Sequence, residues 1–210
     1  MRASHGHQRW WPGDTPFEVC IGAILTQNTA WTNVERAIAN LKAAAVLEPR
    51  RMFALSEEQL AELIRPAGYF NVKARRLRAF LRVLVVDHQG DLRRLFCGET
   101  AQVSARLLAI KGIGPETADS MLLYAGGHLS FVIDAYTRRI FLRHRWCGAS
   151  EGYQELQALC QATLNQKPPS KLLDYWQDYH AQLVRIGKDY CRPRFARCAH
   201  CPLRALLPGG

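Results

Sequence analysis

The 210-residue sequence predicts an all-α fold. Apolar residues recur at helical spacing along nearly the whole chain, capping patterns precede most of these stretches, and glycine or proline separates them. Only residues 128–133 look extended, and one short segment cannot build a sheet. The sequence holds no internal repeat, so we expect helices of ordinary length joined by short turns.

Capping patterns define the first three predicted helices. Residues 15–18 have the threonine and glutamate of a capping box, with proline at the first helical position. Similar boxes at residues 32–35 and 56–59 predict the starts of the second and third helices. Pro66 and Gly68 are expected to end the third.

The next predicted helix starts at Asn71 and has an apolar inner face and a basic outer face. Taken alone, the basic face is typical of a solvated surface; its members are Lys73, Arg75, Arg76, Arg78 and Arg82. The remaining helices are expected to begin at Thr100, Pro115, Asp134, Ser150 and Ser170.

Composition and charge narrow the function class. Hydrophobic content of 48% and charged content of 22% are near globular averages, which argues against disorder. No apolar run approaches the roughly 18 residues of a membrane span, and residues 1–13 lack the apolar stretch of a secretory signal. Seven cysteines without such a signal favour a reducing, cytoplasmic setting over a disulfide framework. The net charge of +10 favours a nucleic-acid partner.

The segment Gly112-Ile113-Gly114 lies between two predicted helices. Two glycines around an apolar residue make a tight hairpin that exposes N–H groups at a helix N-terminus, where a DNA phosphate can bind. Ile113 is expected to hold the hairpin to the core. An ordinary turn with a glycine cap is the alternative.

About twenty residues later, Phe131-Val132-Ile133 leads to Asp134. With this order of hairpin and aspartate, the chain resembles the endonuclease III superfamily of helix–hairpin–helix DNA glycosylases, and residues 25–29 and 68–74 add to the resemblance. The resemblance covers nearly the whole chain and implies a two-lobed all-α fold. One lobe is a helical barrel, residues 16–127, that contains the helix–hairpin–helix at about residues 100–126. Residues 1–15 and 128–210 form the other lobe, with Asp134 at its start.

The resemblance implies a base-excision-repair enzyme that flips a damaged base from double-stranded DNA and hydrolyses its N-glycosidic bond. We expect it to act as a monomer in the cytoplasm, associated with the nucleoid. Asp134 is the implied catalytic residue, because a carboxylate stabilises the oxocarbenium-like charge that develops on the sugar. Considered alone, an aspartate at this position is more often only a helix N-cap.

Glu116 occupies the position at which bifunctional members of the superfamily carry a lysine. A carboxylate cannot form a Schiff base, so a monofunctional glycosylase with little AP lyase activity (strand cleavage at abasic sites) is predicted. Two other functions stay open. One is an endonuclease III-like glycosylase and AP lyase for oxidised pyrimidines, for which Lys111 could supply the amine. The resemblance implies instead that Lys111 lies beside a DNA phosphate. The other is a catalytically inactive helix–hairpin–helix protein that only binds DNA.

Residues 10–12 and 116–119 resemble the 3-methyladenine glycosylase branch of the superfamily, which implies alkylated purines as substrates. Aromatic faces attract a cationic purine by stacking and cation–π interaction. Gln27 is implied to fill the gap that the flipped base leaves, although a turn residue would look the same. The residues expected to form the base pocket are Trp10, Trp11, Pro12, Trp31 and Tyr136. For the tryptophans among them, simple packing is the alternative.

Three cysteines near the C-terminus, Cys191, Cys198 and Cys201, have the spacing of the superfamily's [4Fe–4S] loop, residues 191–207. The fourth cysteine of that loop is replaced by Leu207. The sequence leaves open a cluster whose fourth ligand is solvent, His200 or another group, a zinc site that includes His200, and no metal. The arginines of the loop are expected to contact DNA phosphates in each case: Arg192, Arg194, Arg197 and Arg204.

Overall fold

The computed structural model describes residues 1–10 and 13–208. The regular secondary structure of these residues is helical, as predicted, and their strand-like pairing is limited to an isolated antiparallel bridge between Cys191 and Ala196. None of the helices found in these two ranges is both long and apolar enough to cross a membrane.

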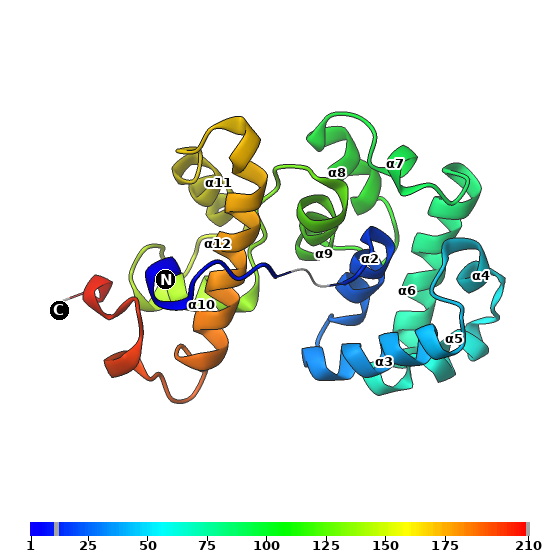
Figure 1. The fold of residues 1–210 in the computed structure, drawn as a ribbon, viewed down its shortest axis with the longest axis horizontal. Helices are drawn as coiled ribbons and strands as arrows, with labels where there is room; N and C mark the ends of the chain where they lie inside the picture. Colours follow the sequence, from blue (N-terminus) through cyan, green and yellow to red (C-terminus); the bar gives the residue numbers. More distant parts are fainter. Residues whose placement is uncertain (11–12, 209–210) are drawn as a thin grey trace. The chain divides into compact units, whose positions relative to one another are not determined.

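The chain divides into two compact units (Figure 1). We call residues 11–128 the hairpin unit, and residues 1–10 with 129–210 the aspartate unit. The α-helices of the hairpin unit are α2 (Pro16–Leu25), α3 (Trp31–Ala43), α4 (Pro49–Ala54), α5 (Glu57–Leu63), α6 (Phe70–Arg82), α7 (Leu92–Leu95), α8 (Thr100–Leu108) and α9 (Pro115–Met121). A 3-10 turn, Arg65–Ala67, and two π-helical turns, Val83–Asp87 and Leu122–Gly126, complete it.

The core of the hairpin unit surrounds α2. Every residue of α2 from Phe17 to Leu25 is buried, and α3, α6 and α9 contact it. A helix that is apolar on all sides is stable only when other elements cover it fully. Its start is as predicted: the Thr15 Oγ1 accepts a hydrogen bond of 3.1 Å from the Glu18 N–H.

The capping box at residues 56–59 is confirmed, because Ser56 and Gln59 bond to each other's backbone N–H at the start of α5. The box at residues 32–35 is wrong. Helix α3 begins at Trp31, whose side chain packs against the core, so Thr32 is already inside the helix.

The helix starts predicted at Thr100, Pro115 and Asp134 are confirmed, and the remaining three are displaced. Helix α6 begins at Phe70, not after Asn71, because Tyr69 takes a left-handed conformation with φ 46° and reverses the chain there. Helix α8 begins at Thr100, as predicted, with Glu99 as its cap. In the aspartate unit, Gly152 and Pro168 precede helices that were expected to start at Ser150 and Ser170.

Lys73 was expected on the basic face of α6 but is buried, with 1% of its surface exposed. Its Nζ donates hydrogen bonds to the carbonyl oxygens of Leu25 at 2.8 Å and Ala67 at 2.7 Å. These carbonyls end α2 and the 3-10 turn, so Lys73 satisfies two helix ends at once. Burial, and then the charge of Arg76, lower the pKa of Lys73 to about 8.

The aspartate unit is built on one long helix, α12 (Pro169–Asp189), and on the shorter α10 (Ala135–Arg143). Helix α10 packs along α12, and the buried Phe131 meets Trp176 edge to face with ring centroids 6.0 Å apart. The N-terminal segment crosses α12 (Figure 1), where the Gln8 N–H donates to Asp178 at 2.7 Å and Gln182 donates to the Gly6 carbonyl at 2.6 Å. The helices of this unit are α1 (Arg2–His5), α10 (Ala135–Arg143), α11 (Tyr153–Thr163), α12 (Pro169–Asp189) and two 3-10 turns, Cys198–His200 and Arg204–Leu206.

Replacing Lys73 by methionine tests its buried role. We expect Lys73→Met to lower the free energy of unfolding at pH 7 by about 3 kcal/mol, because two buried carbonyls lose their donor. Urea titration measures this change. The matched control is Arg75→Met on the exposed side of α6, expected to cost less than about 0.5 kcal/mol. Equal stability of Lys73→Met and wild type would contradict the assignment.

The pH dependence gives a second check on Lys73. Its pKa is depressed in the folded state from 10.5 to about 8, so the unfolded chain binds more protons between these values. Raising the pH through this range therefore increases the stability of the wild type relative to Lys73→Met.

Candidate functional site

The hairpin between α8 and α9 needs glycine at position 112. Gly112 has φ +93°, and a Cβ there would lie 2.4 Å from the Cγ of Arg76. Backbone conformation and space therefore both favour glycine. Gly114 caps α9 in extended conformation, φ −98°, which other residues could adopt.

The hairpin is fixed to the core by its apolar residue. Ile113 is 5% exposed within the core cluster, and its N–H donates to the Ile110 carbonyl at 3.0 Å. Lys111 and Gly112 on either side of this contact are exposed. The backbone of the turn and Lys111 are therefore exposed, while Ile113 anchors the turn in the core.

Gln27 follows α2 and is bound to the hairpin. Its Nε2 donates to the Gly112 carbonyl at 3.1 Å and to the Thr117 hydroxyl at 2.9 Å, and its Oε1 accepts from Arg76. Trp31, four residues later, is half-buried against the core of the same unit. Gln27 and the hairpin thus form one connected surface in the hairpin unit.

Glu116 lies in the first turn of α9 and is exposed. Its carbonyl accepts a hydrogen bond of 2.7 Å from the Ser120 hydroxyl. The position after the hairpin therefore carries a surface carboxylate. Its negative charge interacts favourably with the N-terminal end of the α9 dipole, but it offers no amine.

Asp134 caps α10 in the aspartate unit. The buried residues 131–133 fix the chain that leads to it, and its Oδ1 accepts a 2.7 Å hydrogen bond from the Thr137 N–H. The side chain is 13% exposed. The cap that the sequence suggested is present, and the second carboxylate oxygen points away from that bond toward α12.

His180 on α12 faces this second oxygen. Its Nε2 is 3.6 Å from Asp134 Oδ2, and the histidine side chain is 5% exposed. Burial raises the pKa of Asp134, but hydrogen bonding and charge from His180, with hydrogen bonds from Thr137, outweigh it and hold the pKa below its usual range. Sequence reasoning missed His180, for which the only signal was a histidine on the inner stripe of a long helix.

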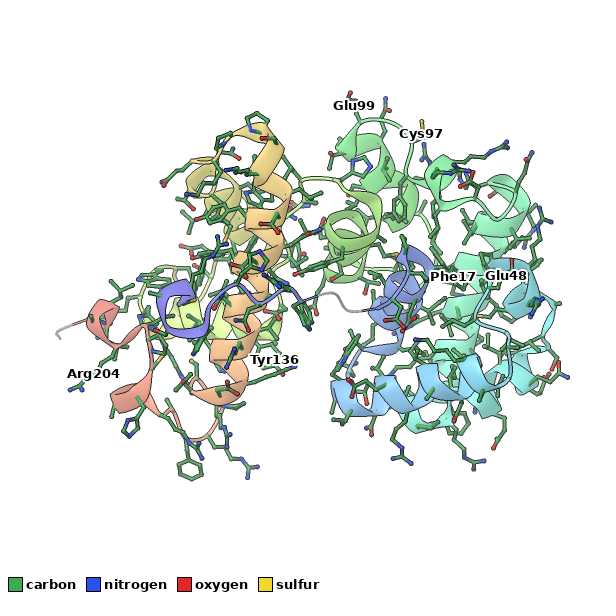
Figure 2. All side chains as sticks on the ribbon, in the orientation of Figure 1. Phe17, Glu48, Cys97, Glu99, Tyr136 and Arg204 are labelled. Carbon is green, nitrogen blue, oxygen red and sulfur yellow. The ribbon has the colours of Figure 1, made fainter. Side chains whose placement is uncertain are left out.

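The predicted base-pocket residues are distributed over both units. Trp10 lies beside His180, with ring centroids 6.0 Å apart, so it belongs to the Asp134 neighbourhood. Tyr136 (Figure 2) packs on the backbone of Gly187, where a Cβ would lie 2.4 Å from its ring, and the Arg139 guanidinium lies 5.1 Å from its centroid. Trp31 is in the hairpin unit, and Trp11 and Pro12 lie outside the described residues.

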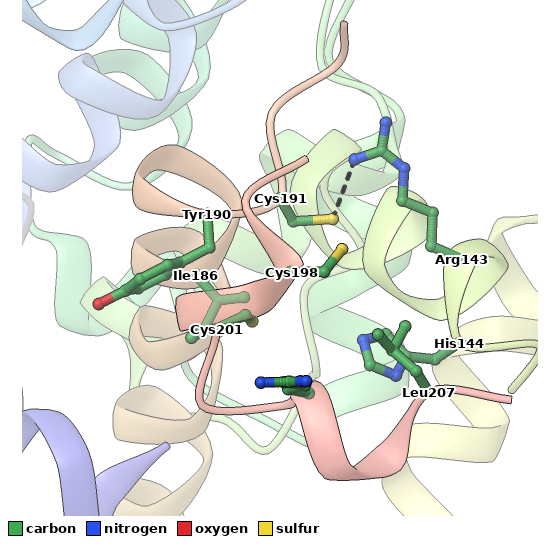
Figure 3. Close-up of a pocket in the computed structure, with 9 residues that line it drawn as sticks. Arg143, His144, Ile186, Tyr190, Cys191, Cys198, Cys201 and Leu207 are labelled. Carbon is green, nitrogen blue, oxygen red and sulfur yellow. Dashed lines mark hydrogen bonds between the residues drawn. The ribbon is translucent and has the colours of Figure 1, made fainter. Parts of the chain in front are cut away.

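The three cysteines of the C-terminal loop line one pocket (Figure 3). The Cys191 Sγ accepts a hydrogen bond of 3.3 Å from Arg143, while Cys198 and Cys201 carry free thiols. Leu207 lines the same pocket, together with His144 from the end of α10. His200 is exposed and is not among the lining residues.

This donor set fits an iron–sulfur cluster better than a single metal ion. Among the described residues, no three histidine, cysteine or acidic side chains gather closely enough to bind one ion, which argues against zinc held by the cysteines and His200. In a [4Fe–4S] cluster each ligand binds a different iron, so the ligands surround a larger volume. Three thiols around a common pocket suit that geometry.

Comparison with known proteins identifies the family. The profile of the HhH-GPD superfamily base excision DNA repair proteins matches residues 21–166. The chain belongs to this superfamily. A protein of Methanocaldococcus jannaschii, provisionally named a DNA repair glycosylase, is 43% identical over 202 residues, or 95% of this chain and 89% of that protein. Endonuclease III of Bacillus subtilis is 24% identical over 195 residues, or 93% of this chain and 82% of the relative.

Solved members of the HhH-GPD superfamily share the fold. The 3-methyladenine DNA glycosylase of H. pylori, bound to 1,N6-ethenoadenine, is 30% identical with a TM-score of 0.72, covering 85% of this chain and 87% of that one. An endonuclease III–DNA complex has a TM-score of 0.75 at 22% identity, covering 93% and 84%. Superfamily membership makes this chain a DNA glycosylase of base excision repair.

Substitution of His180 tests the Asp134 pair without any substrate. In His180→Gln the largely buried carboxylate loses the histidine that lowers its pKa, so we expect the pKa of Asp134 to rise. NMR titration of isotope-labelled aspartate measures the pKa, with Asp134→Asn to assign the signal. His7→Gln is the control, since His7 pairs with Asp174 and Asp178. An unchanged Asp134 pKa in His180→Gln would remove His180 from the site.

Proposed function

We propose that the protein is a monofunctional DNA glycosylase that removes alkylated purines such as 3-methyladenine from double-stranded DNA. The observation that carries the proposal is the Asp134 carboxylate, kept ionised by His180 and the N-terminus of α10 beside Trp10. The 30% identity to a 3-methyladenine glycosylase bound to a modified adenine supports the choice of substrate class.

In the reaction, the carboxylate of Asp134 stabilises the positive charge that develops on the sugar as the bond between C1′ and the base breaks. The bonding electrons leave with the base, and a cationic alkylated purine thereby departs as a neutral molecule. Little acid catalysis on the base is needed. Water then adds to C1′ and releases one proton, which leaves an abasic site.

His180 acts on Asp134 in this scheme. It holds the carboxylate in its charged form and fixes the oxygen that is not used by the α10 cap. Trp10, which lies beside His180, offers an aromatic face that a cationic purine can stack on. Trp10 would therefore stabilise the positively charged base, and Asp134, paired with His180, would stabilise the positive charge of the transition state.

Glu116 favours monofunctional chemistry over the endonuclease III-like alternative. The exposed carboxylate cannot attack the sugar as an amine would, and strand cleavage through a Schiff base needs that amine. Lys111 is the amine nearest in sequence, but it projects from the hairpin, where it suits a phosphate contact.

DNA binding is assigned to the backbone of the Gly112 hairpin, to Lys111 and Gln27, and to the cysteine loop. A shallow surface pocket on that loop is lined by Arg192, Arg194 and Arg197 with Phe195, which is 80% exposed. These groups would contact the DNA backbone, so their binding would not depend on the base sequence. Such binding is consistent with the net charge of +10 and with a glycosylase that searches duplex DNA as a monomer.

Cys191, Cys198 and Cys201 are the residues that would hold a [4Fe–4S] cluster. When bound, the cluster supplies cross-links between the end of α12 and the loop rather than bond chemistry on the substrate. Fixing the loop would fix the arginines within it, so its role is to shape a DNA-binding surface.

Base release tests the proposed activity. The wild type should release free 3-methyladenine from methylated duplex DNA, measured by chromatography. Asp134→Asn keeps the size of the side chain but removes the charge, so we expect the rate to fall roughly hundredfold or more. Glu116→Gln, a matched carboxylate-to-amide change, should retain activity. Absence of release by the wild type would favour the DNA-binding alternative.

Borohydride trapping tests the monofunctional assignment. Incubation of the wild type with an abasic duplex and borohydride should give no covalent protein–DNA adduct, because no amine replaces the family lysine at Glu116. An adduct that disappears in Lys111→Ala would identify Lys111 as the nucleophile and support the lyase alternative.

A further inference from the structure

The family's fourth cluster position, Leu207, lines the cysteine pocket but has no donor atom. The pocket therefore has three thiols and one side without sulfur. Among the other residues that line it, Arg143 is cationic and already donates to Cys191 and to the carbonyls of Arg192 and Pro193. The Tyr190 hydroxyl is 3.5 Å from His5, with which its ring stacks.

His144 is the remaining lining residue with a lone pair suited to iron. It ends α10 and is 7% exposed, with its ring 4.6 Å from the ring of Trp146. Figure 3 shows it beside Leu207 at the pocket. It lies 191 − 144 = 47 residues before Cys191, far outside the spacing of the cysteine motif.

Hydrogen bonding leaves one nitrogen of His144 available to a metal. Nδ1 is 3.0 Å from the Leu206 carbonyl oxygen, which can only accept, so Nδ1 carries a proton. In the neutral ring, Nε2 then has the lone pair for ligation. A backbone carbonyl that holds the other ring nitrogen is the usual support of a metal-bound histidine.

We propose that His144 is the fourth ligand of a [4Fe–4S] cluster, binding through Nε2 with Cys191, Cys198 and Cys201. The inference rests on the cluster proposed above. The contact between His144 and Leu206 joins the end of α10 to the segment that carries Leu207, so the histidine lines the same pocket as the residue that replaces the cysteine. Three thiolates and a neutral imidazole also give the site one negative charge less than four thiolates would.

The test uses the full-length protein purified without oxygen. We expect about four iron and four sulfide ions per chain and visible absorption typical of such a cluster. After reduction, pulsed EPR on protein with isotope-labelled histidine should show one directly bound histidine nitrogen. This measurement needs no substitution, so it does not depend on whether a variant folds.

Three variants separate His144 from other ligands. His144→Ala should lose the nitrogen coupling and lose iron in air at least several-fold faster. Leu207→Cys should also lose the coupling but keep the cluster, because a thiolate replaces the imidazole. His200→Ala, next to Cys201 but outside the pocket, should match the wild type.

A wild-type cluster without histidine coupling, or coupling that persists in His144→Ala, would overturn the ligand assignment while leaving the cluster in place. A colourless, iron-free wild type would overturn both the cluster and the ligand. Neither result touches base release, which depends on Asp134.

Discussion

One buried carboxylate organises the aspartate unit. Oδ1 of Asp134 closes the N-terminus of α10, and Oδ2 faces His180 in the middle of α12, so a single side chain connects the two helices that pack together. A carboxylate with so little exposure is stable in its charged form only if both oxygens are compensated. The same compensation keeps the carboxylate in the charged form that the proposed cleavage of the glycosidic bond requires. The N-terminal segment, bound to Asp178 and Gln182 of α12, then brings Trp10 to His180.

Basic residues have two different duties in the hairpin unit. Lys73 and Arg76 look equivalent on a helical projection of α6. Lys73 nevertheless lies inside the core and donates hydrogen bonds to the carbonyls that end α2 and the 3-10 turn. Arg76 instead donates to Gln27, which is bound to Gly112. Only Lys111 and the other exposed cations remain to contact a polyanion. Basic residues of the same helix therefore differ in whether they are available for DNA.

In the cluster site that we propose, the cysteine loop would lose one ligand residue and keep its chemistry. A fourth ligand is defined by position in space, and the end of α10 reaches the same pocket as Leu207. The Leu206 carbonyl orients the imidazole of His144, so the backbone beside the substituted position supports the replacement donor.

The sequence by itself determined the all-α class, the caps at Thr15, Ser56 and Asp134, and the order of hairpin, aspartate and cysteines, because these depend on neighbours three or four residues apart. It misplaced the start of α3 and the side of α6 on which Lys73 lies, since both are decided by packing against distant helices. Only the tertiary structure paired His180 with Asp134, brought Trp10 to them and placed His144 at the cysteine pocket. These partners lie tens of residues apart, and no local pattern encodes contacts that form only when whole helices pack.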